Sequence, residues 1–127
     1  MGLRLVLTVD DFEQALAFYR DALGLPERWD WETEGDARIA ILDAGRATLE
    51  LVNEAQAAEI DRIEAGRRVA GPVRIAFEVD DSEAVARRLV EAGAEQLADP
   101  VTTPWNDRNV RLQAPDGMQL TLFTVSD

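Results

Sequence analysis

The residues with the most distinctive chemistry are two arginines, Arg4 and Arg74, which occupy equivalent positions in two similar stretches of the chain. Residues 4–13 align with residues 74–83 without a gap, and each arginine precedes the same Val-Asp-Asp sequence. A guanidinium stays protonated and offers N–H donors but no lone pair. These positions therefore favour a carboxylate, phosphate or enolate oxygen and oppose a divalent metal ion.

Other reactive groups are scarce. The chain has no histidine and no cysteine, and its serines are Ser82 and Ser126. Serine-triad chemistry, thiol nucleophiles, thiolate metal sites and disulfides are therefore excluded. No glycine-rich phosphate loop or dinucleotide fingerprint is present. Acid–base chemistry would fall to glutamates, of which Glu50 and Glu78 are candidates.

The secondary-structure elements that must position these residues occur in the same order twice along the chain: a strand, a helix and three further strands. Apolar residues recur at helical spacing after each Val-Asp-Asp sequence, which supplies acidic caps, and the two helices end at Gly24 and Gly93. The period then changes to about two, which predicts strands near 27–33, 37–42 and 46–52, and near 96–103, 108–113 and 118–125. We expect one domain, residues 1–127, with module one at 1–53, a connector at 54–71 containing a short helix near 54–63, and module two at 72–127.

Strand alternation assigns the candidate residues to faces. Leu3, Leu5, Leu7 and Val9 share the side that should meet the helices, so Arg4 points the other way. The counterpart strand sends Arg74 in the same direction. The residues expected to share this face with the arginines are Glu50, Glu78, Thr121 and Phe123.

Two interpretations of the charged residues stay open. In the first, Arg4 and Arg74 neutralise Glu50 and Glu78 and hold the sheet together. In the second, at least one guanidinium is free to bind an oxyanion of a ligand. Both can hold at once.

Three tryptophans allow a similar choice. Trp29 and Trp31 lie two residues apart on a strand pattern and share a face, while Trp105 lies in a loop. They are either an aromatic wall of a cavity or buried packing and dimer contacts.

Composition restricts the class of protein. The chain has 127 residues, 46% of them hydrophobic, and a formal charge of −12. We find no basic stripe for nucleic acid, no apolar run long enough for a membrane span and no signal peptide, so we expect a cytoplasmic protein. The acidic surface favours solubility or attracts a cationic ligand.

The two βαβββ modules, the sequence Ala17–Leu25 and the turn Ala114–Gly117 resemble the vicinal oxygen chelate superfamily, which includes glyoxalases, bleomycin resistance proteins and extradiol dioxygenases. The resemblance implies an α+β fold with cupped mixed sheets, helices on the outer face, a small-molecule cavity and a homodimer. It also places the metal-ligand positions of the family at Arg4, Glu50, Arg74 and Thr121. Of these, Glu50 alone is a normal ligand, so we expect no metal and no cofactor.

Our first hypothesis is a metal-independent binding protein of the bleomycin-resistance type, which sequesters an aromatic or cationic metabolite or antibiotic. The expected ligand-binding residues are Arg4, Arg74, Glu50, Glu78, Thr121, Phe123, Trp29, Trp31 and Trp105. The alternative is a metal-free lyase or isomerase of the glyoxalase type, in which Glu50 is the catalytic base and Arg4 or Arg74 stabilises an oxyanion. A metal enzyme with unusual ligands is disfavoured.

Overall fold

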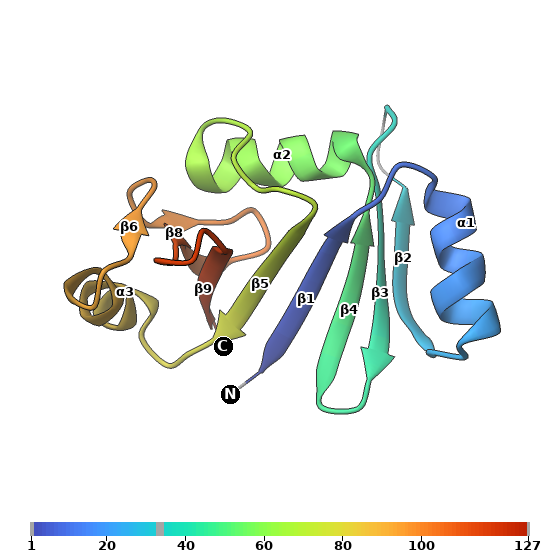
Figure 1. Ribbon diagram of the computed structural model, residues 1–127, viewed down its shortest axis with the longest axis horizontal. Coiled ribbons are helices and arrows are strands. Elements are labelled where there is room, and N and C mark those ends of the chain that lie inside the picture. The colour runs from blue at the N-terminus through green and yellow to red at the C-terminus, as the bar shows by residue number, and fades with distance from the viewer. Residues whose placement is uncertain (1, 33–34, 127) are drawn as a thin grey trace.

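A computed structural model of the chain describes residues 2–32 and 35–126 and shows one mixed sheet with three helical segments around it (Figure 1). The strands are β1 (Leu3–Thr8), β2 (Glu27–Glu32), β3 (Arg38–Ala44), β4 (Ala47–Val52), β5 (Val73–Glu78), β6 (Glu95–Gln96), β7 (Val101–Thr102), β8 (Asp107–Gln113) and β9 (Gln119–Val125). The helices are α1 (Phe12–Leu16), continued by η1 (Ala17–Ala22), then α2 (Glu54–Ala65) and α3 (Ser82–Glu91). The strand order is β2-β3-β4-β1-β5-β9-β8-β6, with β7 paired to β8.

The two modules join through their first strands. β1 and β5 are antiparallel, with Val6 opposite Arg74 and Arg4 opposite Ala76. Within each module the first strand also pairs in parallel with the last one, β1 with β4 and β5 with β9. Glu50 of β4 lies opposite Val6, so Glu50, Val6 and Arg74 form one row across the module boundary.

The module helices cover one face of the sheet, called here the outer face, as the sequence predicts. Phe12 and Leu16 pack with the buried strand residues Ala40, Leu42, Leu49 and Leu51, and Leu5, Leu7 and Val9 pack against this cluster. In module two, Ala86 of α3 packs with Val110, Leu112 and Leu122. The expected alternation of β1 and of β9 is therefore confirmed, and the α+β class with it.

The first module helix differs from the single α-helix expected to end at Gly24. Asp11 caps its start, where the carboxylate accepts a hydrogen bond from the amide of Gln14 at 3.0 Å. From Ala17 the helix widens to π-type hydrogen bonds, such as Leu23 N to Phe18 O at 2.9 Å. The periodicity of the apolar residues does not distinguish these two windings over so few turns.

The connector helix α2 lies on the opposite face, called here the inner face, where it crosses from one module to the other (Figure 1). Asn53 caps α2 by accepting from Gln56 N at 2.9 Å, and Gly66 ends it with a φ of 76°. Ala57 packs beneath the helix on Val6, Val52 and Ile39. The sequence predicted a helix near 54–63, but it did not predict that the helix covers the inner face.

The strand expected at 96–103 is wrong as one element, because the structure has the two short strands β6 and β7 there. Pro100 lies between them and has no N–H for a sheet ladder, so an unbroken strand is disfavoured. Thr33, the last residue of the strand expected at 27–33, lies outside the described residues. Within the described residues, no helix is both long and apolar enough to cross a membrane.

Candidate functional site

The inner face holds a cavity of about 430 Å³ between the sheet and α2. The polar side chains that line it from the strands are the partly exposed Arg4 and the buried Glu50, Arg74, Asn109 and Thr121. Aromatic side chains also line it, and these are Trp29, Trp31, Trp105 and Phe123. The remaining lining is aliphatic from β3, β4, β5 and α2, with Gln56, Glu59 and Glu64 of α2 as further polar residues. A cavity of this volume is typical of small-molecule sites.

Glu50 is a buried carboxylate without a close partner. Its Oε1 lies 3.9 Å from Nε of Arg4, and it makes no hydrogen bond to any described residue. Burial raises the pKa of Glu50, an effect that the charges of Arg74 and Arg4 reduce. Of the two interpretations that the sequence left open, pairing of Glu50 with an arginine is therefore limited to this 3.9 Å contact with Arg4.

Arg74 is buried and contacts a hydroxyl rather than a carboxylate. Its Nη1 donates a hydrogen bond to Oγ1 of Thr121 at 2.8 Å. Burial lowers the pKa of the guanidinium, while the carboxylates of Glu64 and Glu50 act in the opposite direction. Among the described residues, no acidic group forms a salt bridge with Arg74.

A third arginine, Arg111 of β8, fills the inner face beside Thr121 and is completely buried. Its Nη1 donates to Asp61 at 2.7 Å and its Nη2 to Glu64 at 3.0 Å, and both acceptors are on α2. Thr121 donates to Glu64 at 3.1 Å, and Asn109 also donates to Glu64 at 3.1 Å. These bonds attach α2 to module two.

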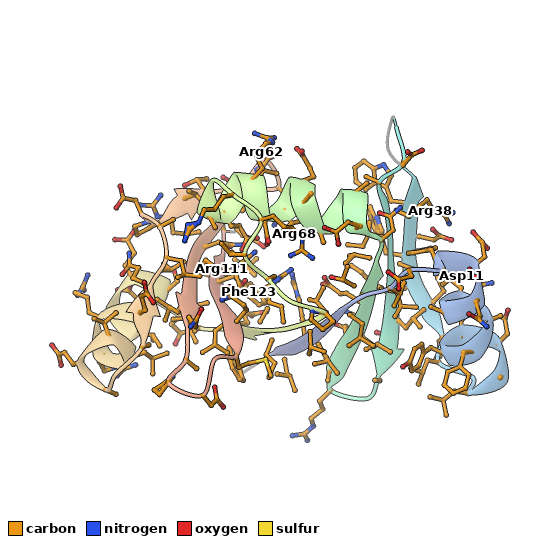
Figure 2. All side chains as sticks on the ribbon, turned by 45° about the horizontal axis from the view of Figure 1, so that its top comes forward. Asp11, Arg38, Arg62, Arg68, Arg111 and Phe123 are labelled. Carbon is orange, nitrogen blue, oxygen red and sulfur yellow. The ribbon has the colours of Figure 1, made fainter. Side chains whose placement is uncertain are left out.

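Asp61 also holds the chain that follows α2. Its Oδ2 accepts hydrogen bonds from Arg68 Nη1 at 2.9 Å, Val69 N at 2.7 Å and Ala70 N at 2.8 Å. Burial opposes ionisation of Asp61, but these backbone bonds and Arg111 outweigh it, and the pKa is lowered. In Figure 2, Arg111 and Arg68 lie beneath α2, whereas Arg62 projects from its outer side.

The aromatic residues stand at the mouth of the cavity rather than in a core. Trp29 and Trp31 are each 51% exposed and Trp105 is 46% exposed. The rings of Trp29 and Trp31 have centroids 5.9 Å apart, because alternate residues of β2 share a face. Trp105 lies in the tight β7–β8 turn, which is closed by Thr103 N to Asp107 O at 2.8 Å. Burial as core packing is therefore excluded for all three.

Phe123 is more buried than the tryptophans, and the guanidinium of Arg4 packs on its ring. The guanidinium carbon of Arg4 lies 4.1 Å from the centroid of the Phe123 ring. This contact is of the cation–π type and orients Arg4 along the cavity wall.

The residues at the family metal positions do not fit a divalent metal. Arg4 and Arg74 have no lone pair to donate. The Thr121 hydroxyl donates to Glu64 and accepts from both Arg74 and Arg111, so its hydrogen-bonding capacity is used. Glu50 alone would remain, and one carboxylate does not make a metal site.

The structure places eight of the nine expected ligand-binding residues around the cavity. Glu78 is the exception, because it is the last residue of β5, is exposed, and has its side chain against Gly2. The sequence analysis missed Arg111, Asp61, Glu64 and Asn109. The alternation of β8 carries a signal for two of them, since Asn109 and Arg111 alternate with the apolar Val110 and Leu112.

Comparisons with known proteins agree with this fold. A curated relative, "Uncharacterized protein YraH" of Bacillus subtilis (strain 168), is 29% identical and covers 97% of each chain. A hypothetical protein, BH1468 of Bacillus halodurans C-125, has a TM-score of 0.71 at 18% identity, covering 98% of this chain and 93% of its own. Methylmalonyl-CoA epimerase of Streptomyces coelicolor, solved as a variant with 2-nitronate-propionyl-CoA, has a TM-score of 0.67 at 23% identity and covers 98% and 96%.

The family itself is established by a sequence model that spans nearly the whole chain, since the match covers residues 3–122. The chain belongs to the Glyoxalase/Bleomycin resistance protein/Dioxygenase superfamily.

Proposed function

We propose that the protein binds a small aromatic molecule, a metabolite or an antibiotic, in the inner-face cavity without a metal ion. The observation that carries the proposal is the lining itself. Tryptophan rings stand half-exposed at the mouth, and arginines occupy the positions where a metal would need ligands. Of the two ligand classes predicted from the sequence, aromatic and cationic, this lining favours the aromatic one, because the two guanidinium groups repel a cation.

The experiment is a calorimetric titration of the purified protein, after treatment with EDTA, against a panel of neutral and charged one- and two-ring aromatic compounds. We expect saturable binding that is unchanged when Zn²⁺, Ni²⁺ or Mn²⁺ is added. The apolar and aromatic lining should give a negative heat-capacity change of binding. Absence of binding across the panel, or binding that requires one of the metals, would contradict the proposal.

A second candidate, a metal-free lyase or isomerase, is favoured by one observation. Glu50 is a carboxylate in the cavity whose pKa is raised by burial, and Arg74 and Arg4 lie near it to stabilise an oxyanion. Methylmalonyl-CoA epimerase shares the fold, which supports an enzyme of this type by analogy only. If any panel compound is converted, Glu50→Gln should abolish turnover while binding persists.

The assembly is part of the proposal. We propose a homodimer, as the family resemblance implies, and light scattering coupled to size exclusion tests it. A monomer mass at micromolar concentration would contradict this part and leave the binding site in place, because both modules that line the cavity belong to one chain.

A further inference from the structure

Around the buried Arg74 and the partly exposed Arg4, the cavity has more hydrogen-bond donors than acceptors. Arg74 and Arg4 each carry five N–H donors. Arg74 uses its side chain in one hydrogen bond, to Thr121, and Arg4 makes none with the described residues. The one described carboxylate within ion-pair distance of either guanidinium is Glu50, at 3.9 Å from Arg4.

The neighbouring acids do not use these donors. Glu64 accepts from Arg111, Asn109 and Thr121, and so its oxygens are engaged. Asp61 is engaged by Arg111 and by the loop after α2. Asp107 interacts with the charge of Arg4 but accepts no hydrogen bond from it. The unused donors of Arg74 and Arg4 are therefore available to a ligand in the cavity that both residues line.

The cavity is also polarised along its depth. Arg74 is 9% exposed, whereas the three tryptophans at the mouth are about half exposed. A ligand that matches this cavity has a negatively charged group, which binds at the buried end near Arg74, and an aromatic ring, which stays near the tryptophans at the mouth. The formal net charge of −12 opposes the approach of an anion, but its field is screened over about 8 Å at physiological ionic strength.

We propose that the ligand is an aromatic carboxylate, or an aromatic compound with an equivalent oxyanion, whose anionic group binds Arg74 and Arg4 while its ring lies among Trp29, Trp31 and Trp105. This inference rests on the proposed aromatic-binding function and adds the sign and the orientation of the ligand. Glu50 lines the same cavity beside Arg4, and we expect it to take up a proton when the anion binds, because two neighbouring carboxylates disfavour a shared negative charge.

The test compares three probes with the same ring system and different charge: 1-naphthoate, 1-naphthalenemethanol and 1-naphthylmethylammonium, titrated into the full chain by calorimetry at pH 7. We expect 1-naphthoate to bind about tenfold or more tightly than the other two, the size of effect that charge-assisted hydrogen bonds give. Titrations in buffers of different ionisation enthalpy should show proton uptake with 1-naphthoate and none with the alcohol.

Variants locate the effect. Arg74→Met should remove the preference for 1-naphthoate but keep the affinity for the alcohol, and Arg4→Met should reduce the preference. The control is Arg46→Met, which makes the same change of charge on an exposed arginine in the β3–β4 turn. If Arg74→Met does not fold, Arg4→Met decides, because Arg4 is partly exposed and makes no hydrogen bond with described residues.

The outcomes separate this inference from the proposed function. Equal affinity for the three probes, or tightest binding of the ammonium, contradicts the proposal that the ligand carries an oxyanion, but it leaves the proposed aromatic-binding site in place. Loss of the 1-naphthoate preference in Arg46→Met as well also overturns it, because the effect would then be one of net charge. Failure of all three probes while other panel compounds bind rejects the inference alone. Failure of the probes and of the whole panel rejects the proposed function.

Discussion

Nη1 of Arg111 lies 2.7 Å from Oδ1 of Asp61, and this contact joins β8 of module two to the connector helix α2. Both side chains are almost fully buried. A buried ion pair has to recover the desolvation of both charges, and here Asp61 does so through additional backbone and Arg68 hydrogen bonds. The pair therefore fixes α2 over the inner face, and α2 in turn forms one wall of the cavity.

We expect Asp61→Asn to destabilise the protein by about 3 kcal/mol or more, because the change removes one of the two buried carboxylates that pair with Arg111, and the other, Glu64, also accepts from Thr121 and Asn109. Urea unfolding followed by circular dichroism measures the effect. The matched control is Glu59→Gln on the same helix, whose exposed pair with Arg62 should be worth less than about 1 kcal/mol. Similar losses for both variants would contradict a special role for the Asp61–Arg111 pair.

Asp61 also gives the protein a defined sensitivity to acid. The folded-state pKa of Asp61 is below its ordinary value of 3.8, so the stability from its ionised form is present above pH 3.8 and is lost as the pH falls through the folded-state pKa. We expect the melting temperature to decrease as the pH falls below about 4, and to decrease more steeply in the wild type than in Asp61→Asn. Parallel acid profiles for the two proteins would contradict this assignment.

The sequence was sufficient for the repeated module and for the faces of its strands, because alternation along β1, β5 and β9 is set by which side packs on α1 and α3. That alternation also brought Arg4, Arg74 and Thr121 to one face correctly. It was insufficient for Glu78, since alternation gives the direction of a side chain but not where the cavity ends along the strand.

The partners of the arginines could not be predicted for a different reason. The acids that determine the electrostatics, Asp61 and Glu64, lie on the connector helix, and their side of the sheet depends on how α2 crosses the two modules. Asp61 and Glu64 are three residues apart and so share one side of α2, but this spacing does not indicate which strand that side faces. Pairing of Glu50 with an arginine was one of the two interpretations that the sequence left open. In the structure Arg111 binds the carboxylates of α2, and among the described residues Glu50 has no hydrogen bond, only the 3.9 Å contact with Arg4.

Glu50 should destabilise the protein when it is ionised. Its folded-state pKa is above the ordinary 4.5, so the stability associated with the neutral carboxyl is present below pH 4.5 and is lost as the pH rises through the raised pKa. Arg74 and Arg4 reduce this loss and Glu64 adds to it. We expect Glu50→Gln to match the wild type in melting temperature near pH 4 and to exceed it at pH 8. A lower melting temperature of the Gln variant at pH 8 would show that the arginines outweigh burial.

Thr121 connects the cavity to the buried network, because its hydroxyl accepts from Arg74 and Arg111 and donates to Glu64. We expect Thr121→Val to cost about 1–3 kcal/mol in urea unfolding, since it leaves two buried donors and one acceptor with a missing partner at nearly constant volume. Thr102→Val, at an exposed position of β7, is the control, and we expect a change within about 0.5 kcal/mol. Equal losses of stability in the two variants would mean that the hydrogen bonds of the Thr121 hydroxyl do not stabilise the buried network.

The aromatic mouth makes a prediction that separates binding from stability. Trp29 is 51% exposed and lines the cavity. Trp29→Leu therefore removes contact between the ring and a ligand, while the surface that the side chain buries in the fold changes little. We expect about a tenfold loss of affinity for an aromatic probe, in line with the energy of an aromatic pair, and a melting temperature close to the wild type. Phe18→Leu is the matched control, because Phe18 is 62% exposed on η1, outside the set of residues that line the cavity. It should leave probe affinity unchanged, and an equal loss in both variants would place the ligand elsewhere than at this mouth.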